Sequence, residues 1–309
     1  MLQLYLHIGS GKTGTSALQA HLAQHRPALA ALGIAYPASS GGAEGRGHDD
    51  LAKLCIAPLP PLMKPLKAPK AARAAILAEL RVITEPIALI SAEHLELADP
   101  AQVKALLDQV GRPYQARILY VVRSPDEQME AEYNQLVKLG RFSKPVSDYA
   151  ETLYDGDIAA VAEAWDGVFG QGSLIARVYD AARPDALGLL AGMMEQPSIT
   201  RALPPLERQA NASLGIQALT AIRLWTALGG SRKDPHLDVL RQDHPKDLPA
   251  LYMDAVEARA FRARFAAITR RFSARYLGQE TEDLGGRRYS DAERDAIRAQ
   301  IRGLRLGRS

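Results

Sequence analysis

The segment "LYLHIGSGKTGTSALQAHL", Leu4 to Leu22, decides the fold. An apolar run rich in strand formers leads to a glycine turn, then to a lysine and hydroxyl residues, and then to leucines at helical spacing. This order predicts a strand over residues 2–8, a tight loop, and a helix from Thr15. The nucleotide loop G-x-x-x-x-G-K-[ST] needs a glycine at position 6, where this chain has Leu6, so the loop here is a shorter one.

The loop residues are suited to binding a phosphate group. Glycines permit backbone conformations in which successive N–H groups turn toward an anion, and the helix start adds the positive end of its dipole. Lys12 supplies a mobile charge, and hydroxyl groups supply donors. The candidate ligands are Gly11, Lys12, Thr13, Gly14, Thr15 and Ser16. The alternative is a plain glycine turn with a solvated lysine, which leaves the Lys-Thr-Gly-Thr-Ser order unexplained.

Four later segments also predict strands, and their apolar residues are nearly continuous. They cover residues 34–36, 87–91, 116–122 and 173–180. Continuous apolar strands separated by helices indicate a parallel sheet covered on both faces, and the chain after about residue 195 is mostly helical in pattern. The fold class is therefore α/β, with a central parallel sheet flanked by helices and a helix-rich C-terminal third.

Three segments with charged and hydroxyl side chains follow predicted strands. They are residues 9–16, 91–94 and 123–126. Ligands in parallel α/β sheets bind beyond the carboxyl ends of the strands, so we expect these segments to form the site.

Composition excludes several classes of protein. The net charge of +3 and the pI near 8.9 suit an anionic ligand but are too weak to indicate nucleic acid, and 6% aromatic residues argue against a base-stacking surface. The single cysteine, Cys55, can form neither an internal disulfide nor a metal cluster. We see no signal peptide and no apolar run long enough for a membrane span, which predicts a cytoplasmic protein.

The loop resembles that of a known family. "HIGSGKTGTSALQ" is similar to the 5′-phosphosulfate loop of the sulfotransferases that use PAPS (3′-phosphoadenosine 5′-phosphosulfate), and most closely to bacterial members that begin H-[IV]-G-x-x-K-T-G-T. The resemblance implies a P-loop-like three-layer fold, PAPS as co-substrate and no required metal. It also implies a single domain over residues 1–309. Its donor-binding core would be about 1–36 and 85–180, and residues 37–84 and 195–309 would shape the acceptor side.

A second segment, "YVVRSPDEQMEAEYNQLVKLG", resembles the family's 3′-phosphate site, which uses an arginine at a strand end and a serine two turns into the next helix. The arginine is Arg123. The serine position holds Ala131, so one hydroxyl contact, worth about 1.5–3 kcal/mol, is absent. The alternative for Arg123 is an ordinary strand-end salt bridge, with Asp126 as one candidate partner.

The helix after Arg123 has its own start signals. Ser124 and Glu127 match a capping box, with Pro125 at the first helical position. An apolar stripe at helical spacing follows, made by Met129, Tyr133, Leu136 and Val137.

Two late basic loops are candidates for closing over the donor. "DLGGRRYSDAERD" carries Arg287 and Arg288 and faintly resembles the family's glycine-arginine loop, and "SRKD" carries Arg232 and Lys233.

The acceptor needs a general base, and the sequence leaves several candidates. Glu93 follows a strand, and the bacterial family members carry a similar S-x-E; the alternative is an acid that caps the next turn. His48 lies in a glycine-rich segment that predicts a mobile lid or a solvated loop. His94 adjoins Glu93 and is another candidate for the base. His7 lies in the first strand, where we expect a structural role.

The resemblance implies sulfuryl transfer from PAPS to a hydroxyl or amine, with a carbohydrate or a small metabolite as acceptor. Lys12 would stabilise the leaving 3′-phosphoadenosine 5′-phosphate (PAP), and a Glu or His would take the acceptor proton. The alternatives are a P-loop kinase that uses ATP and a nucleotide-binding protein that has lost catalysis, which Ala131 favours.

Overall fold

The computed structural model describes residues 1–39, 46–60, 63–182, 184–206, 214–231, 234–241 and 248–306. The chain divides into two compact units. The first comprises Met1–Val122, Ile158–Arg208 and Thr269–Thr281, and the second Arg123–Asp157, Gln209–Ile268 and Glu282–Ser309. We describe each unit by itself, and the expectation of one domain over residues 1–309 stays a prediction.

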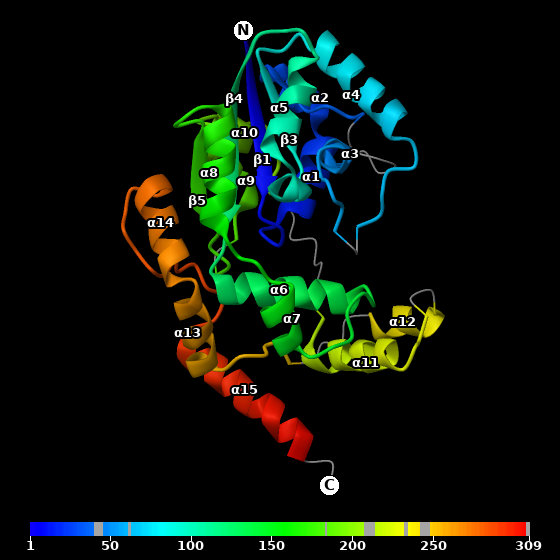
Figure 1. Ribbon diagram of the computed structural model, residues 1–309, viewed down its shortest axis with the longest axis vertical. Coiled ribbons are helices and arrows are strands. Elements are labelled where there is room, and N and C mark those ends of the chain that lie inside the picture. Colours follow the sequence, from blue (N-terminus) through cyan, green and yellow to red (C-terminus); the bar gives the residue numbers. More distant parts are fainter. Residues whose placement is uncertain are drawn as a thin grey trace. The chain divides into compact units, whose positions relative to one another are not determined.

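A five-stranded parallel sheet forms the centre of the first unit, in the order β2-β3-β1-β4-β5 (Figure 1). The strands are β1 (Leu2–Gly9), β2 (Ile34–Ala35), β3 (Ile87–Ser91), β4 (Tyr114–Val122) and β5 (Leu174–Val178). All five predicted strands are present, with shifts of a few residues at their ends. The α/β class with a parallel sheet is confirmed.

The apolar run before the loop becomes the central strand because both of its faces are buried. Leu4 and Leu6 turn to one face and Tyr5 to the other, and all three side chains are buried. β1 pairs with β3 so that His7 lies opposite Ser91, and it pairs with β4 through a register shift between His7 and Gly9. The loop therefore starts at the middle of the sheet's carboxyl edge.

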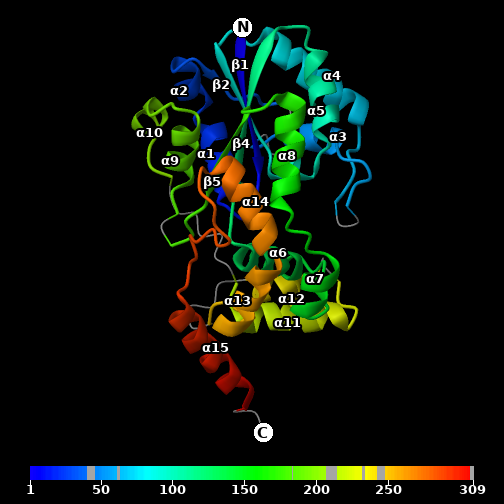
Figure 2. The same cartoon turned by 60° about the vertical axis from the view of Figure 1, so that its left-hand side comes forward.

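Helices cover both faces of this sheet (Figure 2). One layer contains α1 (Thr15–Gln24), α2 (Arg26–Ala31), α9 (Ala186–Met193) and α10 (Ser198–Ala202). The other side carries α4 (Pro69–Val82), α5 (Pro100–Asp108) and α8 (Ile158–Phe169), with α3 (Asp49–Leu54) and the 3₁₀ turn η2 (Glu93–Leu97) packed against each other. The three-layer arrangement agrees with the predicted architecture.

The predicted helix after the loop is divided in two. α1 ends at Gln24 and α2 begins at Arg26, with Pro27 in its first turn, because a proline has no N–H to continue the ladder of α1. Gly33 ends the segment with φ of 76°, as the glycine predicts.

The second unit is helical. Its helices are α6 (Pro125–Lys138), α7 (Val146–Thr152), α11 (Ile216–Ala227), α12 (Pro235–Leu240), α13 (Ala255–Arg264) and α15 (Asp291–Leu306), and α14 (Ala266–Tyr276) passes into the first unit at Thr269. The predicted stripe of α6 is confirmed, since Met129, Tyr133 and Val137 are buried and Leu136 packs against them in a core shared with α7, α11 and α13.

Candidate functional site

The glycine loop has the backbone turn expected of an anion-binding loop. Gly9 and Gly14 have φ of 128° and 81°, and Lys12 has φ of 66°, a region that side-chain-bearing residues rarely adopt. A Cβ atom at Gly14 would lie 3.3 Å from the Cβ atom of Ala186, so the position also needs the missing side chain. Gly14 is the N-cap of α1, and no side chain in the described part of the chain caps this helix start.

The loop is fixed to the sheet by its own polar groups. The Ser10 N–H donates to the Val121 carbonyl of β4 at 2.5 Å, and the Thr13 hydroxyl donates to the Ser10 carbonyl at 2.7 Å. Thr13 is buried, so its one hydroxyl proton serves the loop's own geometry, whereas Ser16 is exposed. A phosphate contact by Thr13 would come from its backbone.

Glu93 lies directly against the loop. It begins η2 immediately after β3, and its Oε2 atom accepts a hydrogen bond of 2.8 Å from the hydroxyl of Thr15, which is buried. Two predicted segments, separated by 78 positions, therefore meet in the first unit as the strand-end argument expected. The N-cap of η2 is Ala92, so Glu93 is not the capping residue.

A second carboxylate of η2, which was not among the residues predicted from the sequence, also contacts the loop. Glu96 Oε1 accepts from the Ser10 hydroxyl at 2.9 Å and from the Tyr120 hydroxyl at 2.7 Å. Residues three apart lie above one another in a 3₁₀ turn, so Glu93 and Glu96 reach the same loop. The E-x-x-E spacing after a strand end was the signal that could have revealed it.

His48 does not lie on an exposed lid, and that prediction is wrong. It is the N-cap of α3 and is fully buried, with Nδ1 accepting the Ser91 N–H at 2.9 Å. Burial lowers its pKa to about 4, which keeps the ring neutral at physiological pH. These contacts make His48 part of the packing under the strand end, and they do not favour an acid–base role.

His7 is structural, as predicted. It is buried, burial lowers its pKa to about 4, and its Nδ1 atom lies 2.8 Å from the hydroxyl of Ser91. Gln19 of α1 donates to the Ser91 carbonyl at 3.2 Å. Ser91 thus joins β1, α1 and α3 beneath the loop.

His94 forms an ion pair with Asp49, the first residue of α3. The His94 Nδ1 atom lies 3.0 Å from Asp49 Oδ1, and the two side chains are 32% and 40% exposed. Burial opposes the charge on each group, but their contact outweighs it, raising the pKa of His94 and lowering that of Asp49. The pair is oriented as an imidazole with a supporting carboxylate, a common arrangement for a general base.

In the second unit, Arg123 forms a strand-end salt bridge, as the alternative expected, and Glu127 is its partner. Arg123 Nη2 lies 2.5 Å from Glu127 Oε2, and the side chains are only 12% and 6% exposed. The predicted capping box is wrong, because the Ser124 side chain donates to Asp126 Oδ1 at 2.6 Å and makes no capping hydrogen bond to the helix backbone. Pro125 occupies the first helical position, as predicted.

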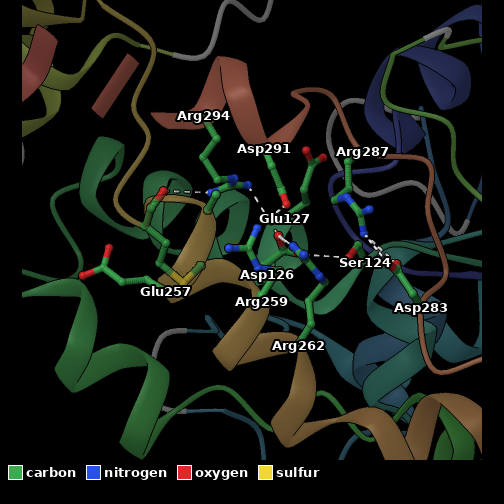
Figure 3. A network of polar contacts seen from close by, with 12 residues as sticks. Ser124, Asp126, Glu127, Glu257, Arg259, Arg262, Asp283, Arg287, Asp291 and Arg294 are labelled. Carbon is green, nitrogen blue, oxygen red and sulfur yellow. Dashed lines mark hydrogen bonds and ion pairs between the residues drawn. The ribbon is translucent and has the colours of Figure 1, made fainter. Parts of the chain in front are cut away.

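The first two turns of α6 carry a buried charge network, drawn in Figure 3. Asp126, with no exposed surface, contacts Arg262 of α13 at 2.7 Å and Arg294 of α15 at 3.5 Å. Arg294 also contacts Glu130 at 3.0 Å. Burial raises the pKa of Glu130, and Arg294 together with the N–H groups of residues 252 and 253 counters that effect.

The Arg287 loop lies against this network. Gly285 and Gly286 both have positive φ, Asp283 forms a salt bridge with Arg287 at 2.6 Å, and the Arg288 N–H donates to Glu127 Oε1 at 2.7 Å. The second unit therefore brings Arg123 and this loop onto one carboxylate. The competing candidates, Arg232 and Lys233, lie outside the described residues.

Ala131 is half-buried on α6, and the nearby amide of Asn134 donates to the Ala250 carbonyl at 3.4 Å.

Within the described ranges, no group of three His, Cys, Asp or Glu side chains is arranged to hold a metal ion. No helix in the described part of the chain has both the length and the apolar composition needed to cross a membrane.

Comparison with known proteins gives one structural likeness. No protein-family model matches the chain, and no curated protein matches it. The chain is similar to the crystal structure of a sulfotransferase from Alicyclobacillus acidocaldarius, with 16% identity and a TM-score of 0.46, over 87% of this chain and 94% of that one. The function proposed below rests on the residues of the loop and of the strand ends.

Proposed function

We propose that this protein is a PAPS-dependent sulfotransferase that moves a sulfuryl group to a hydroxyl or amine acceptor. The observation that carries the proposal is the contact between Thr15 and Glu93. It joins a short lysine-containing phosphate loop to a carboxylate at the carboxyl edge of a parallel sheet. A donor-binding loop and a proton acceptor side by side are the two parts that sulfuryl transfer needs.

Each end of the donor has a proposed ligand. The 5′-phosphosulfate would be bound by the backbone N–H groups of residues 11–16, by Lys12, and by the hydroxyls of Thr15 and Ser16. The 3′-phosphate would be bound by Arg123, which follows the last residue of β4 directly. Guanidinium groups bind phosphate well because their donors form a planar fork.

The reaction is an in-line displacement at sulfur. The acceptor oxygen or nitrogen forms a bond to sulfur while the bond between sulfur and the bridging oxygen of PAP breaks. Negative charge grows on that oxygen, and the Lys12 ammonium is the group that would neutralise it. The acceptor's proton would pass to Glu93.

Thr15 links donor binding to that base. A threonine hydroxyl has one proton, and in the structure that proton is donated to Glu93 Oε2. If the Thr15 hydroxyl donates its hydrogen bond to a bound phosphate, it can no longer donate that bond to Glu93. Donor binding would then release the carboxylate for the acceptor.

His94 is the second candidate for the base, and its contact with Asp49 favours it. The carboxylate at Nδ1 leaves Nε2 as the atom that can accept a proton from substrate. A Glu93→Gln variant that keeps most of its transfer rate, together with a His94→Gln variant that loses it, would assign the base to His94.

Two other functions remain as alternatives. A P-loop kinase would transfer phosphate from ATP, but the loop lacks the first glycine of the nucleotide motif, where the chain has Leu6. A nucleotide-binding protein without catalysis is favoured by Ala131.

Transfer of label distinguishes these functions. The protein is incubated with ³⁵S-labelled PAPS, or with γ-³²P-ATP and Mg²⁺, and a panel of carbohydrate, phenol and amine acceptors. We expect ³⁵S transfer to at least one acceptor class and its loss by about a hundredfold or more in Lys12→Ala. Transfer of ³²P in place of ³⁵S would identify a kinase. PAP binding without transfer to any acceptor would favour the non-catalytic function.

A further inference from the structure

Glu127 uses both of its carboxylate oxygens on groups that the proposed function assigns to the donor or to its closing loop. Oε2 contacts the Arg123 guanidinium at 2.5 Å, and Oε1 accepts the Arg288 N–H at 2.7 Å. The side chain is only 6% exposed. One buried carboxylate thus connects a strand-end arginine to a loop 161 positions away in sequence.

Neighbouring residues of α6 form buried ion pairs that help to fix the position of Glu127. Asp126, the preceding residue of α6, is bound to Arg262 of α13, and both are buried (Figure 3). Glu130, one turn further along α6, is bound to the buried Arg294 of α15. These contacts hold the first two turns of α6 in one orientation. The position of Glu127 on α6 therefore depends on these buried ion pairs as well as on its own salt bridge with Arg123.

The loop that Glu127 contacts contains a tight glycine turn. Gly285 and Gly286 both have positive φ, at 67° and 64°, a conformation that costs glycine little. The Arg287–Asp283 salt bridge fixes one side of this turn, and the bond from Arg288 to Glu127 fixes the other.

We infer that Glu127 is a positioning residue that sets the orientation of Arg123 and couples it to the Asp283–Arg288 loop. The inference rests on the proposed function, because it takes Arg123 to be the ligand of the 3′-phosphate. Preference for a 3′-phosphorylated nucleotide then depends on a carboxylate that does not itself contact the nucleotide. An anion at Arg123 changes the contact at Glu127, and that change reaches the loop through the Arg288 N–H.

Two simpler roles for Glu127 predict different results. If Glu127 only stabilised α6 through an i,i+4 salt bridge, its removal would lower stability and leave nucleotide preference unchanged. If its charge only repelled phosphate, its removal would raise affinity for PAP. A positioning role lowers the preference for PAP, so the sign of the change separates the three.

The first test measures affinity for PAP and for AMP, which lacks the 3′-phosphate, in wild type, Glu127→Gln, Glu127→Ala and Arg123→Ala. We expect the ratio of the two affinities to fall at least about threefold in Glu127→Ala and less in Glu127→Gln, which can still accept one hydrogen bond. In the Arg123→Ala background, Glu127→Ala should change the ratio no further. Asp238→Asn, which breaks an exposed salt bridge with Arg241 in the same unit, is the matched control and should leave the ratio unchanged.

The second test follows the loop by hydrogen exchange in residues 283–289. PAP, but not AMP, should slow exchange there in wild type, and Glu127→Ala should abolish that difference. An unchanged or increased PAP preference in Glu127→Ala overturns the inference, as does equal slowing by PAP in both proteins. If wild type binds PAP no better than AMP, the proposed 3′-phosphate site itself fails, a result distinct from a preference that persists without Glu127.

Discussion

Replacing Thr15 with valine tests whether Glu93 and a bound phosphate share one proton. Valine replaces the hydroxyl of this buried threonine with a methyl group of similar size, so the surrounding packing should persist. In the structure that hydroxyl donates to Glu93 Oε2 at 2.8 Å. For the hydroxyl to bind phosphate, it must leave Glu93.

The size of the effect follows from this exchange. A hydrogen bond to a charged group is worth about 1.5–3 kcal/mol. In the wild-type background the hydroxyl trades one such bond for another, so Thr15→Val should weaken PAP binding by less than about fivefold. In a Glu93→Ala background there is no bond to give up, and the same substitution should weaken binding by about ten- to a hundredfold.

Titration calorimetry of PAP against the four proteins of this cycle measures the coupling. The loss of negative charge in Glu93→Ala acts equally whether position 15 holds threonine or valine, so it cancels in the cycle. Equal weakening by Thr15→Val in the two backgrounds would refute the shared-proton reasoning. A larger effect in the presence of Glu93 would contradict it as well.

Three further predictions concern stability. Gly14→Ala should lower the free energy of unfolding by about 1–2 kcal/mol because the backbone there is left-handed, and by a further amount because the added Cβ atom would contact Ala186. Gly111→Ala is the control for backbone strain alone, since Gly111 has φ of 74° and its added Cβ atom would meet no atom within 4 Å. Urea unfolding of both variants measures the difference. Arg294→Met leaves the buried Glu130 without its cationic partner and leaves Asp126 with Arg262 alone, so it should cost about 3–5 kcal/mol. Arg302→Met, which breaks an exposed pair with Asp254, should cost at most about 1 kcal/mol. The pair of His94 with Asp49 stabilises the fold only where both are charged, above the lowered pKa of Asp49 and below the raised pKa of His94. Asp49→Asn should therefore lower the unfolding midpoint at about pH 5.5 and have little effect at about pH 9, and an equal loss at both values would contradict the ion pair.

Sequence alone predicted the sheet and the loop because both depend on local signals. Continuous apolar runs specify buried parallel strands, and the glycine turn before Thr15 specifies a strand-to-helix connection. The meeting of the loop with Glu93 also followed, since the carboxyl ends of neighbouring parallel strands share an edge.

Partners of buried polar groups could not be predicted in the same way. His48 lies in a glycine-rich segment typical of an exposed loop, but its buried ring accepts the N–H of Ser91 at the end of β3. Glu127 has the spacing of a capping box, yet Arg123 and the distant Arg288 N–H take both of its oxygens. These choices depend on contacts between segments far apart in sequence, which local patterns do not contain.

The measurement that tests the proposed donor most directly is calorimetric titration of PAP, ADP and ATP without added metal, on wild type, Lys12→Ala and Arg123→Ala. We predict that PAP binds at least about tenfold more tightly than ADP, that both substitutions weaken PAP, and that Arg123→Ala removes its advantage over ADP. Equal affinity for PAP and ADP in the wild-type protein would contradict a 3′-phosphate site at Arg123 and, with it, the assignment of PAPS as the donor.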